Sequence, residues 1–170
     1  MRIISTFMLI LSFSMISSSI GLAKAMKYNH DSITIEEVKK EVDFHVLVPE
    51  KIPSEWSLEI KTYDHNGEDM GTIRLHYMDS TDENVMLGIE ERKVSEKEFR
   101  QLEEEFLDRN KINVNGVEAY YQEFANNGRK LNGKRMSGGL LTWIQGETYL
   151  QMDSSILSKD EMVEMARTVK

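Results

Sequence analysis

Residues 73–89 read IRLHYMDSTDENVMLGI. Apolar side chains stand at every second position on both sides of a polar segment that runs from residue 79 to residue 84. A period of two places successive side chains on opposite faces of a strand, and a segment rich in Asp, Ser and Asn is typical of a turn. The stretch therefore predicts two antiparallel strands that bury one face.

The same alternation continues on both sides of this pair. Further runs lie at residues 44–48 and 56–60, and later at residues 112–119, 141–143 and 148–152. Asn115-Gly116 is a hairpin signal, because both residues tolerate the positive φ angles that a two-residue turn needs. Gly146-Glu147 marks a second tight turn. The pattern predicts a series of antiparallel hairpins.

Three segments carry a capping box, in which a Ser or Thr hydroxyl and a Glu carboxylate each bond a free amide of the first helical turn. The pairs are Thr34 with Glu37, Ser95 with Glu98, and Ser158 with Glu161. Apolar residues at helical spacing follow each box, as in Phe99, Leu102 and Phe106 after the second. Each box therefore predicts the start of a helix with one buried face.

Strand runs followed by helices, without regular alternation, favour an α+β fold. We expect a curved antiparallel sheet of about six to eight strands, with the C-terminal helix packed on one face and short N-terminal and central helices. Residues 34–170 form this single domain, behind a loose tether at residues 26–33 and a signal peptide at residues 1–25.

The first 25 residues have the layout of a signal peptide. Arg2 precedes an apolar stretch at residues 3–22, and Ala23-Lys24-Ala25 ends it with small outer residues. We expect cleavage between Ala25 and Met26. The alternative is an uncleaved anchor formed by residues 3–22, since a spanning helix needs roughly 20 residues. Either form places the domain outside the cytoplasmic membrane, secreted or extracytoplasmic.

Charge and cysteine content exclude several functions. Arg2 and Lys24 lie in the leader, so the other 19 basic and 29 acidic side chains give residues 26–170 a net charge of −10. Such a domain repels nucleic acid, and it contacts a membrane only through an uncleaved leader. The absence of cysteine excludes disulfides, thiolate zinc sites, iron–sulfur clusters and thiol nucleophiles.

No catalytic motif is present: the chain has no Gly-x-Ser-x-Gly elbow, phosphate-binding loop or dinucleotide fingerprint. His65 and His76 could meet across a hairpin, near Asp64 or Asp69, and form a metal site; the alternative is that His65 is a solvated turn residue and His76 points out of its strand. We interpret Glu90-Glu91 and residues 103–105 as solvated faces and the many methionines as core filling. We expect a protein without catalytic residues, cofactor or metal.

One segment contrasts with the acidic domain. Residues 129–135 read RKLNGKR, with basic side chains at Arg129, Lys130, Lys134 and Arg135. Glycine- and asparagine-rich residues flank the segment, which predicts an exposed loop. It is either a solvated hairpin tip or a contact for an anionic partner, such as wall polymer, a lipid head group or an acidic protein.

Residues 48–58, VPEKIPSEWSL, resemble the opening motif V-P-x-x-L-P-x-G-[WY]-x-L of a domain of unknown function, with Glu55 in place of the glycine. Residues 112–116, 143–150 and 158–170 resemble later motifs of that family in the same order, so the similarity covers residues 33–170. The family is found in secreted proteins, lipoproteins and the extracytoplasmic C-termini of anti-sigma factors of Gram-positive spore-formers. The resemblance implies an envelope sensor or binding domain and brings no catalytic residues.

The sequence thus leaves three hypotheses of different class. The first is an exported, non-catalytic binding or sensor domain for an envelope protein or an anionic or apolar ligand. The second is a lipid or lipoprotein carrier with an apolar cavity under the sheet. The third is a small secreted hydrolase, which would need a cluster of polar side chains that no motif indicates.

The leader generates the first testable prediction. Intact-mass measurement on protein recovered from its own cells should give a chain that begins at Met26, because the small residues at 23 and 25 direct cleavage there. A recovered chain that still holds residues 1–25 would contradict cleavage and favour the anchored form.

Overall fold

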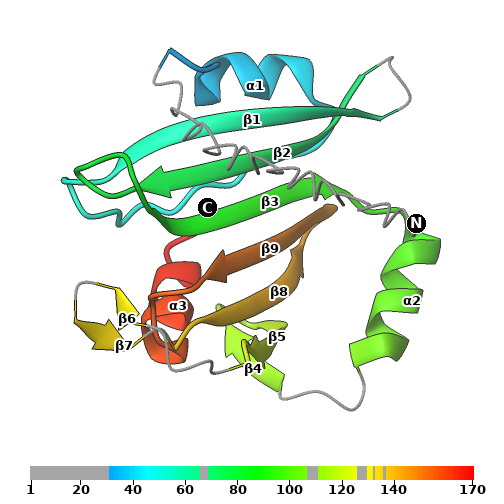
Figure 1. The fold of residues 1–170 in the computed structure, drawn as a ribbon. Coiled ribbons are helices and arrows are strands. Elements are labelled where there is room, and N and C mark those ends of the chain that lie inside the picture. The colour runs from blue at the N-terminus through cyan, green and yellow to red at the C-terminus, as the bar shows by residue number, and fades with distance from the viewer. Residues whose placement is uncertain (1–30, 66–68, 107–110, 126–129, 132, 136) are drawn as a thin grey trace, which may run out of the picture.

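Seven strands form one antiparallel sheet in the order β1-β2-β3-β9-β8-β5-β4 (Figure 1). This computed structural model describes residues 31–65, 69–106, 111–125, 130–131, 133–135 and 137–170. In sheet order the strands are β1 (Ser57–His65), β2 (Asp69–Met78), β3 (Val85–Lys93), β9 (Thr148–Ser154), β8 (Gly139–Gln145), β5 (Val117–Glu123) and β4 (Lys111–Val114). A separate hairpin pairs β6 (Lys130–Leu131) with β7 (Lys134–Arg135).

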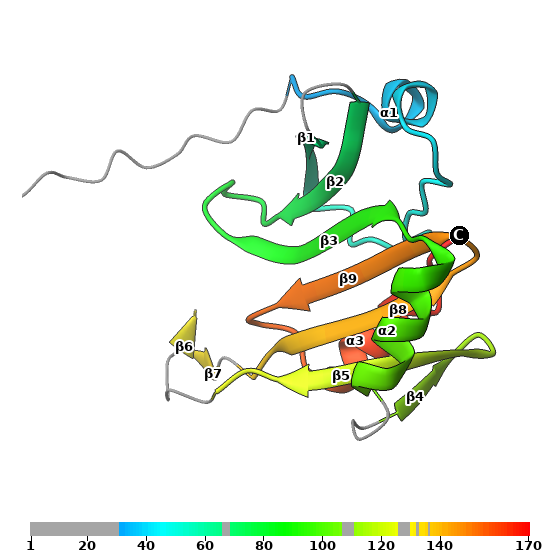
Figure 2. The same ribbon diagram turned by 90° about the vertical axis from the view of Figure 1, so that its right-hand side faces the viewer.

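Three helices within the described residues complete the α+β fold and confirm the predicted class. They are α1 (Ile35–Glu41), α2 (Glu96–Phe106) and α3 (Lys159–Ala166). α1 and α3 lie on one side of the twisted sheet, which we term the core face. α2 lies on the other side of β8 and β5 from α3, on what we term the outer face (Figure 2).

Two of the three predicted capping boxes are complete in the structure. Thr34 and Glu37 exchange both hydrogen bonds at the start of α1, and Ser158 and Glu161 do the same at the start of α3. At α2 the Glu98 amide donates to Ser95 Oγ at 3.3 Å, whereas the Glu98 carboxylate pairs with Arg92 of β3 at 2.6 Å. The third helix start is therefore tied to the sheet.

The turn and the core follow the sequence pattern. Asn115 and Gly116 have φ angles of 53° and 90°, which confirms the two-residue hairpin between β4 and β5. The alternating apolar residues of the strands face α1 and α3, and the helices add buried side chains to the same cluster. Fully buried members include Ile73, Leu75, Leu87, Ile89, Leu141, Leu150, Met152 and Met162.

Residues 44–48 do not form the strand predicted from their alternation. Residues 44–50 are an extended segment, which we term the strap, with one bridge from Pro49 to Val169 and with Phe44, Val46 and Leu47 all buried. The strap cannot join the sheet beside β3, because β2 and β9 already occupy both edges of that strand. Its backbone groups instead bond side chains of the sheet and the end of the chain.

The edge strands β1 and β4 each pair with a strand on one side only, and the chain protects the two edges differently. The amide of Ile60 on β1 donates to Ser32 Oγ at 3.1 Å, so residues just before α1 cover part of that edge. β4, at the other edge, has only four residues and carries exposed Lys111. Short length, charge and covering segments are the usual ways to keep edge strands from pairing with other chains.

Close backbone approach at Gly138 gives a stability prediction. A Cβ atom there would lie 1.7 Å from the carbonyl oxygen of Ser154, and backbone cannot move aside cheaply. Gly138→Ala should therefore destabilise the fold by about 3 kcal/mol in urea unfolding. Gly88→Ala is the matched control, because its Cβ would meet the end of the Asp153 side chain, which can rotate. Equal losses for the two variants would contradict this explanation.

Candidate functional site

The candidate site is a groove between α2 and the outer face of the sheet. It holds a partly open cavity of about 210 Å³. Its lining residues come from α2, β5 and β8, and they are Phe99, Leu102, Val117, Glu118, Tyr120, Trp143 and Ile144. Apolar and aromatic side chains thus dominate the walls, as in most ligand sites.

The sequence of α2 explains why the groove is apolar yet open. Phe99 and Leu102 are three residues apart and face the sheet together. Both stay partly exposed, so they line a cavity instead of filling it. The prediction that this helix buries one continuous apolar face is therefore too strong for these two residues, and the Phe106 side chain lies outside the described part.

Two ion pairs, each beside an aromatic ring, involve lining residues or their neighbours in the sequence and the strand register, and we term them the rim of the groove. The Arg92 guanidinium lies 4.2 Å from the centre of the Tyr149 ring and pairs with Glu98 of α2. On the other side, Lys111 Nζ lies 2.9 Å from Glu118 Oε2, and the Tyr120 hydroxyl donates to the same oxygen at 3.0 Å. These contacts orient the walls, although exposed pairs of this kind add little stability.

The chemistry of the groove suits binding better than reaction. Hydrogen bonds from Lys111 and Tyr120 lower the pKa of Glu118, so this carboxylate is a weak base. The other lining residues are apolar or aromatic, and none of those described offers a histidine or an aliphatic hydroxyl nucleophile. The arrangement can accept an apolar group and hold polar atoms at the rim.

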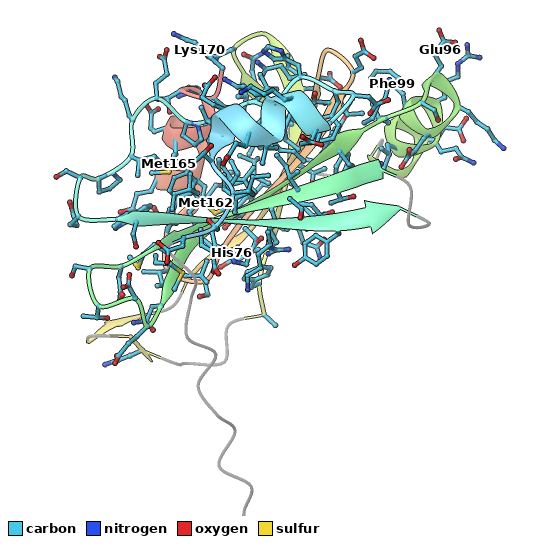
Figure 3. The ribbon with its side chains drawn as sticks, turned by 90° about the horizontal axis from the view of Figure 1, so that it is seen from above. His76, Glu96, Phe99, Met162, Met165 and Lys170 are labelled. Carbon is cyan, nitrogen blue, oxygen red and sulfur yellow. The ribbon has the colours of Figure 1, made fainter. Side chains whose placement is uncertain are left out.

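A second cluster of charged groups lies on the outer face of β1, β2, β3 and β9. Figure 3 places His76 on the opposite side of the strands from α1. Arg74 Nε donates to His76 Nε2 at 2.9 Å, and its terminal nitrogen bonds Asp153 Oδ1 at 2.5 Å. Burial, and then the charges of Arg74 and Lys61, lower the pKa of His76 to about 4, so the imidazole is neutral at pH 7.

This cluster has the character of a structural ion-pair network. Gly88 lies beneath it, and a side chain at that position would overlap the Arg74–Asp153 pair. His76 points out of its strand, as expected. The His65 side chain lies outside the described part, and the described residues contain no group of three or more His, Asp or Glu placed to hold a metal ion.

The interpretation of Glu90-Glu91 as a solvated face is wrong for Glu91. Its side chain is completely buried on the core face, whereas Glu90 lies on the outer face near Arg74. The amide of Leu47 in the strap donates to Glu91 Oε2 at 2.9 Å. Burial raises the pKa of Glu91 to about 8, so it carries a proton at neutral pH.

A sequence signal for this burial exists. Leu87 and Ile89 are both buried on the core face of β3, and a period of two puts Glu91 on that same face. Charged residues are rarely buried without a partner, which is why composition favoured exposure. The period of two therefore predicts the burial of Glu91 correctly, whereas its charge does not.

The remaining predicted site residues lie apart from the groove or outside the description. β6 pairs with β7, so that exposed Lys130 lies opposite Arg135 and Leu131 lies opposite Lys134 in the strand register, while the side chains of Lys134 and Arg135 lie outside the described part. Arg129, Ala25 and Met26 lie outside the described residues. Met78, Met152 and Met162 are fully buried in the apolar interior.

The fold and groove define an α+β domain built on one curved antiparallel sheet. Residues 46–169 match the family described as Domain of unknown function (DUF4367), and the chain belongs to that family. No curated protein matches the sequence. Within the described residues, no helix has both the length and the apolar character needed to cross a membrane.

Proposed function

We propose that this protein is an exported, non-catalytic binding domain that takes an apolar group of an envelope protein or ligand in the groove beneath α2. The observation that carries the proposal is the partly open cavity of about 210 Å³ with apolar and aromatic walls. An apolar cavity of about 150 Å³ is large enough to bind benzene. The groove thus suits one large apolar side chain or a short aliphatic segment.

The groove also resembles the pockets that anchor partner proteins. Binding surfaces commonly centre on a pocket that takes one aromatic or aliphatic anchor, surrounded by polar contacts that exclude water. Phe99, Leu102 and Ile144 supply such a pocket, and the Arg92–Glu98 and Lys111–Glu118 pairs supply the rim. The net charge of −10 over residues 26–170 disfavours strongly anionic partners at this face.

Export and the hairpin belong to the same proposal. The leader supports a location outside the cytoplasmic membrane. The basic segment at residues 129–135 is a separate contact for an anionic partner, and Lys130, its described basic side chain, is not among the residues that line the groove. The carrier and hydrolase alternatives have less support, because a lipid needs a larger cavity and Glu118, the carboxylate among the described wall residues, is a weak base.

Benzene titration followed by backbone amide NMR tests the groove. Benzene should shift the amides of residues 99–102 and 143–144 in a saturable way, because it fits between the apolar walls. Ile144→Trp should abolish these shifts by filling the cavity. Lys97→Trp is the matched control, since it places the same side chain at an exposed position of α2. Saturable shifts that persist in Ile144→Trp would contradict the proposal.

A further inference from the structure

Glu91 is a buried ionisable group that the groove does not use. Its carboxyl lies on the core face of β3, between Ile73 of β2 and Leu150 of β9 in the strand register. Oε2 accepts the Leu47 amide of the strap, while Oε1 is buried and has no hydrogen-bond partner. A carboxylate ion in this position would lack the hydrogen bonds that its second oxygen needs, and burying such an ion costs far more than burying the neutral acid, so the closed strap favours the acid.

The strap connects this carboxyl to the end of the chain. The Val48 amide donates to the Lys170 carbonyl at 3.0 Å, and the Lys170 amide donates back at 3.1 Å. The Glu50 amide bonds the Thr168 carbonyl at 2.9 Å. On the other side of Leu47, the Thr148 hydroxyl donates to the His45 carbonyl at 2.8 Å. The strap and residues 168–170 therefore form one hydrogen-bonded unit laid over the sheet.

We propose that Glu91 is a proton-controlled latch: loss of its proton to solvent releases the strap together with residues 168–170, while the sheet stays folded. The ion needs water, and lifting the strap is the shortest route by which water reaches it. Only the O–H bond of the acid breaks in this step, and the proton passes to water. The inference is independent of the groove.

The groups around Glu91 set the direction of the effect. Lys39 of α1 and the Leu47 amide favour the ion, and burial opposes it more strongly. Tyr77 of β2 faces the same interior, and burial together with Glu91 raises its pKa, so it stays neutral. β9 and the strap contribute apolar Leu150 and Leu47. The described surroundings thus contain one cation and no second acid that titrates with Glu91.

The sign of the pH dependence follows from linkage. The closed state holds the Glu91 proton up to a pKa of about 8, and the opened state releases it near the ordinary value of 4.5. Between these values the opened state binds fewer protons, so the opening constant rises about tenfold per pH unit and then levels off. The opening constant is therefore lowest in acid and rises towards alkaline pH.

Amide hydrogen exchange on the full chain between pH 5 and 7.5 tests the latch. After correction for intrinsic exchange rates, the opening constants of Leu47, Val48 and Lys170 should rise about tenfold per pH unit, whereas that of Ile89 should not. Glu91→Gln should remove the slope, because an amide does not ionise. Glu90→Gln is the matched control on the opposite face of the same strand and should keep it.

Each contrary outcome is distinct. A flat profile at Leu47 in the unaltered protein would overturn the proposal without need of a variant, even if Glu91→Gln fails to fold. The same slope at Ile89 as at Leu47 would mean that Glu91 acts on global unfolding and not on the strap. A slope that persists in Glu91→Gln would assign the effect to another group.

Discussion

The hydrogen bond from the Leu47 amide to the buried Glu91 carboxyl is the contact on which the arrangement of the chain depends. It holds the strap against β3, and the strap in turn pairs with residues 168–170 at the end of α3. Both helices of the core face are thereby tied to the same strand of the sheet. Burial of an ion at this contact would be costly, and this cost raises the pKa of Glu91, so that the carboxyl stays neutral at pH 7.

The two faces of the sheet are covered to different extents. α1, α3 and the strap close the core face over a continuous apolar cluster. The outer face carries the Arg74 cluster over one half and α2 over the other, and α2 leaves the half-open groove between Phe99 and Ile144. A closed face gives stability and an incompletely closed face gives a place to bind, which is the basis of the proposed function.

Local pattern predicted much of the fold. Alternation identified the strands, Asn115-Gly116 identified a hairpin, and the boxes at Thr34 and Ser158 formed with both of their hydrogen bonds. The failures concern tertiary contacts: alternation cannot show that β3 already has two neighbours, so the strap was predicted as a strand. The groove could not be predicted either, because its walls come from three separate elements, α2, β5 and β8, and form only through tertiary contacts. The burial of Glu91 could be predicted, since the period of two along β3 places its side chain on the core face.

The protonation state of Glu91 at neutral pH is the central claim, because it explains how a carboxyl can fix the strap inside an apolar core. The most direct measurement is a carbon-13 NMR titration of the Glu91 side-chain carboxyl, assigned by comparison with Glu91→Gln. The structure predicts a midpoint at a pKa of about 8. A midpoint at the ordinary value of 4.5 would mean that the carboxyl is ionised at pH 7, and would contradict the account of the strap.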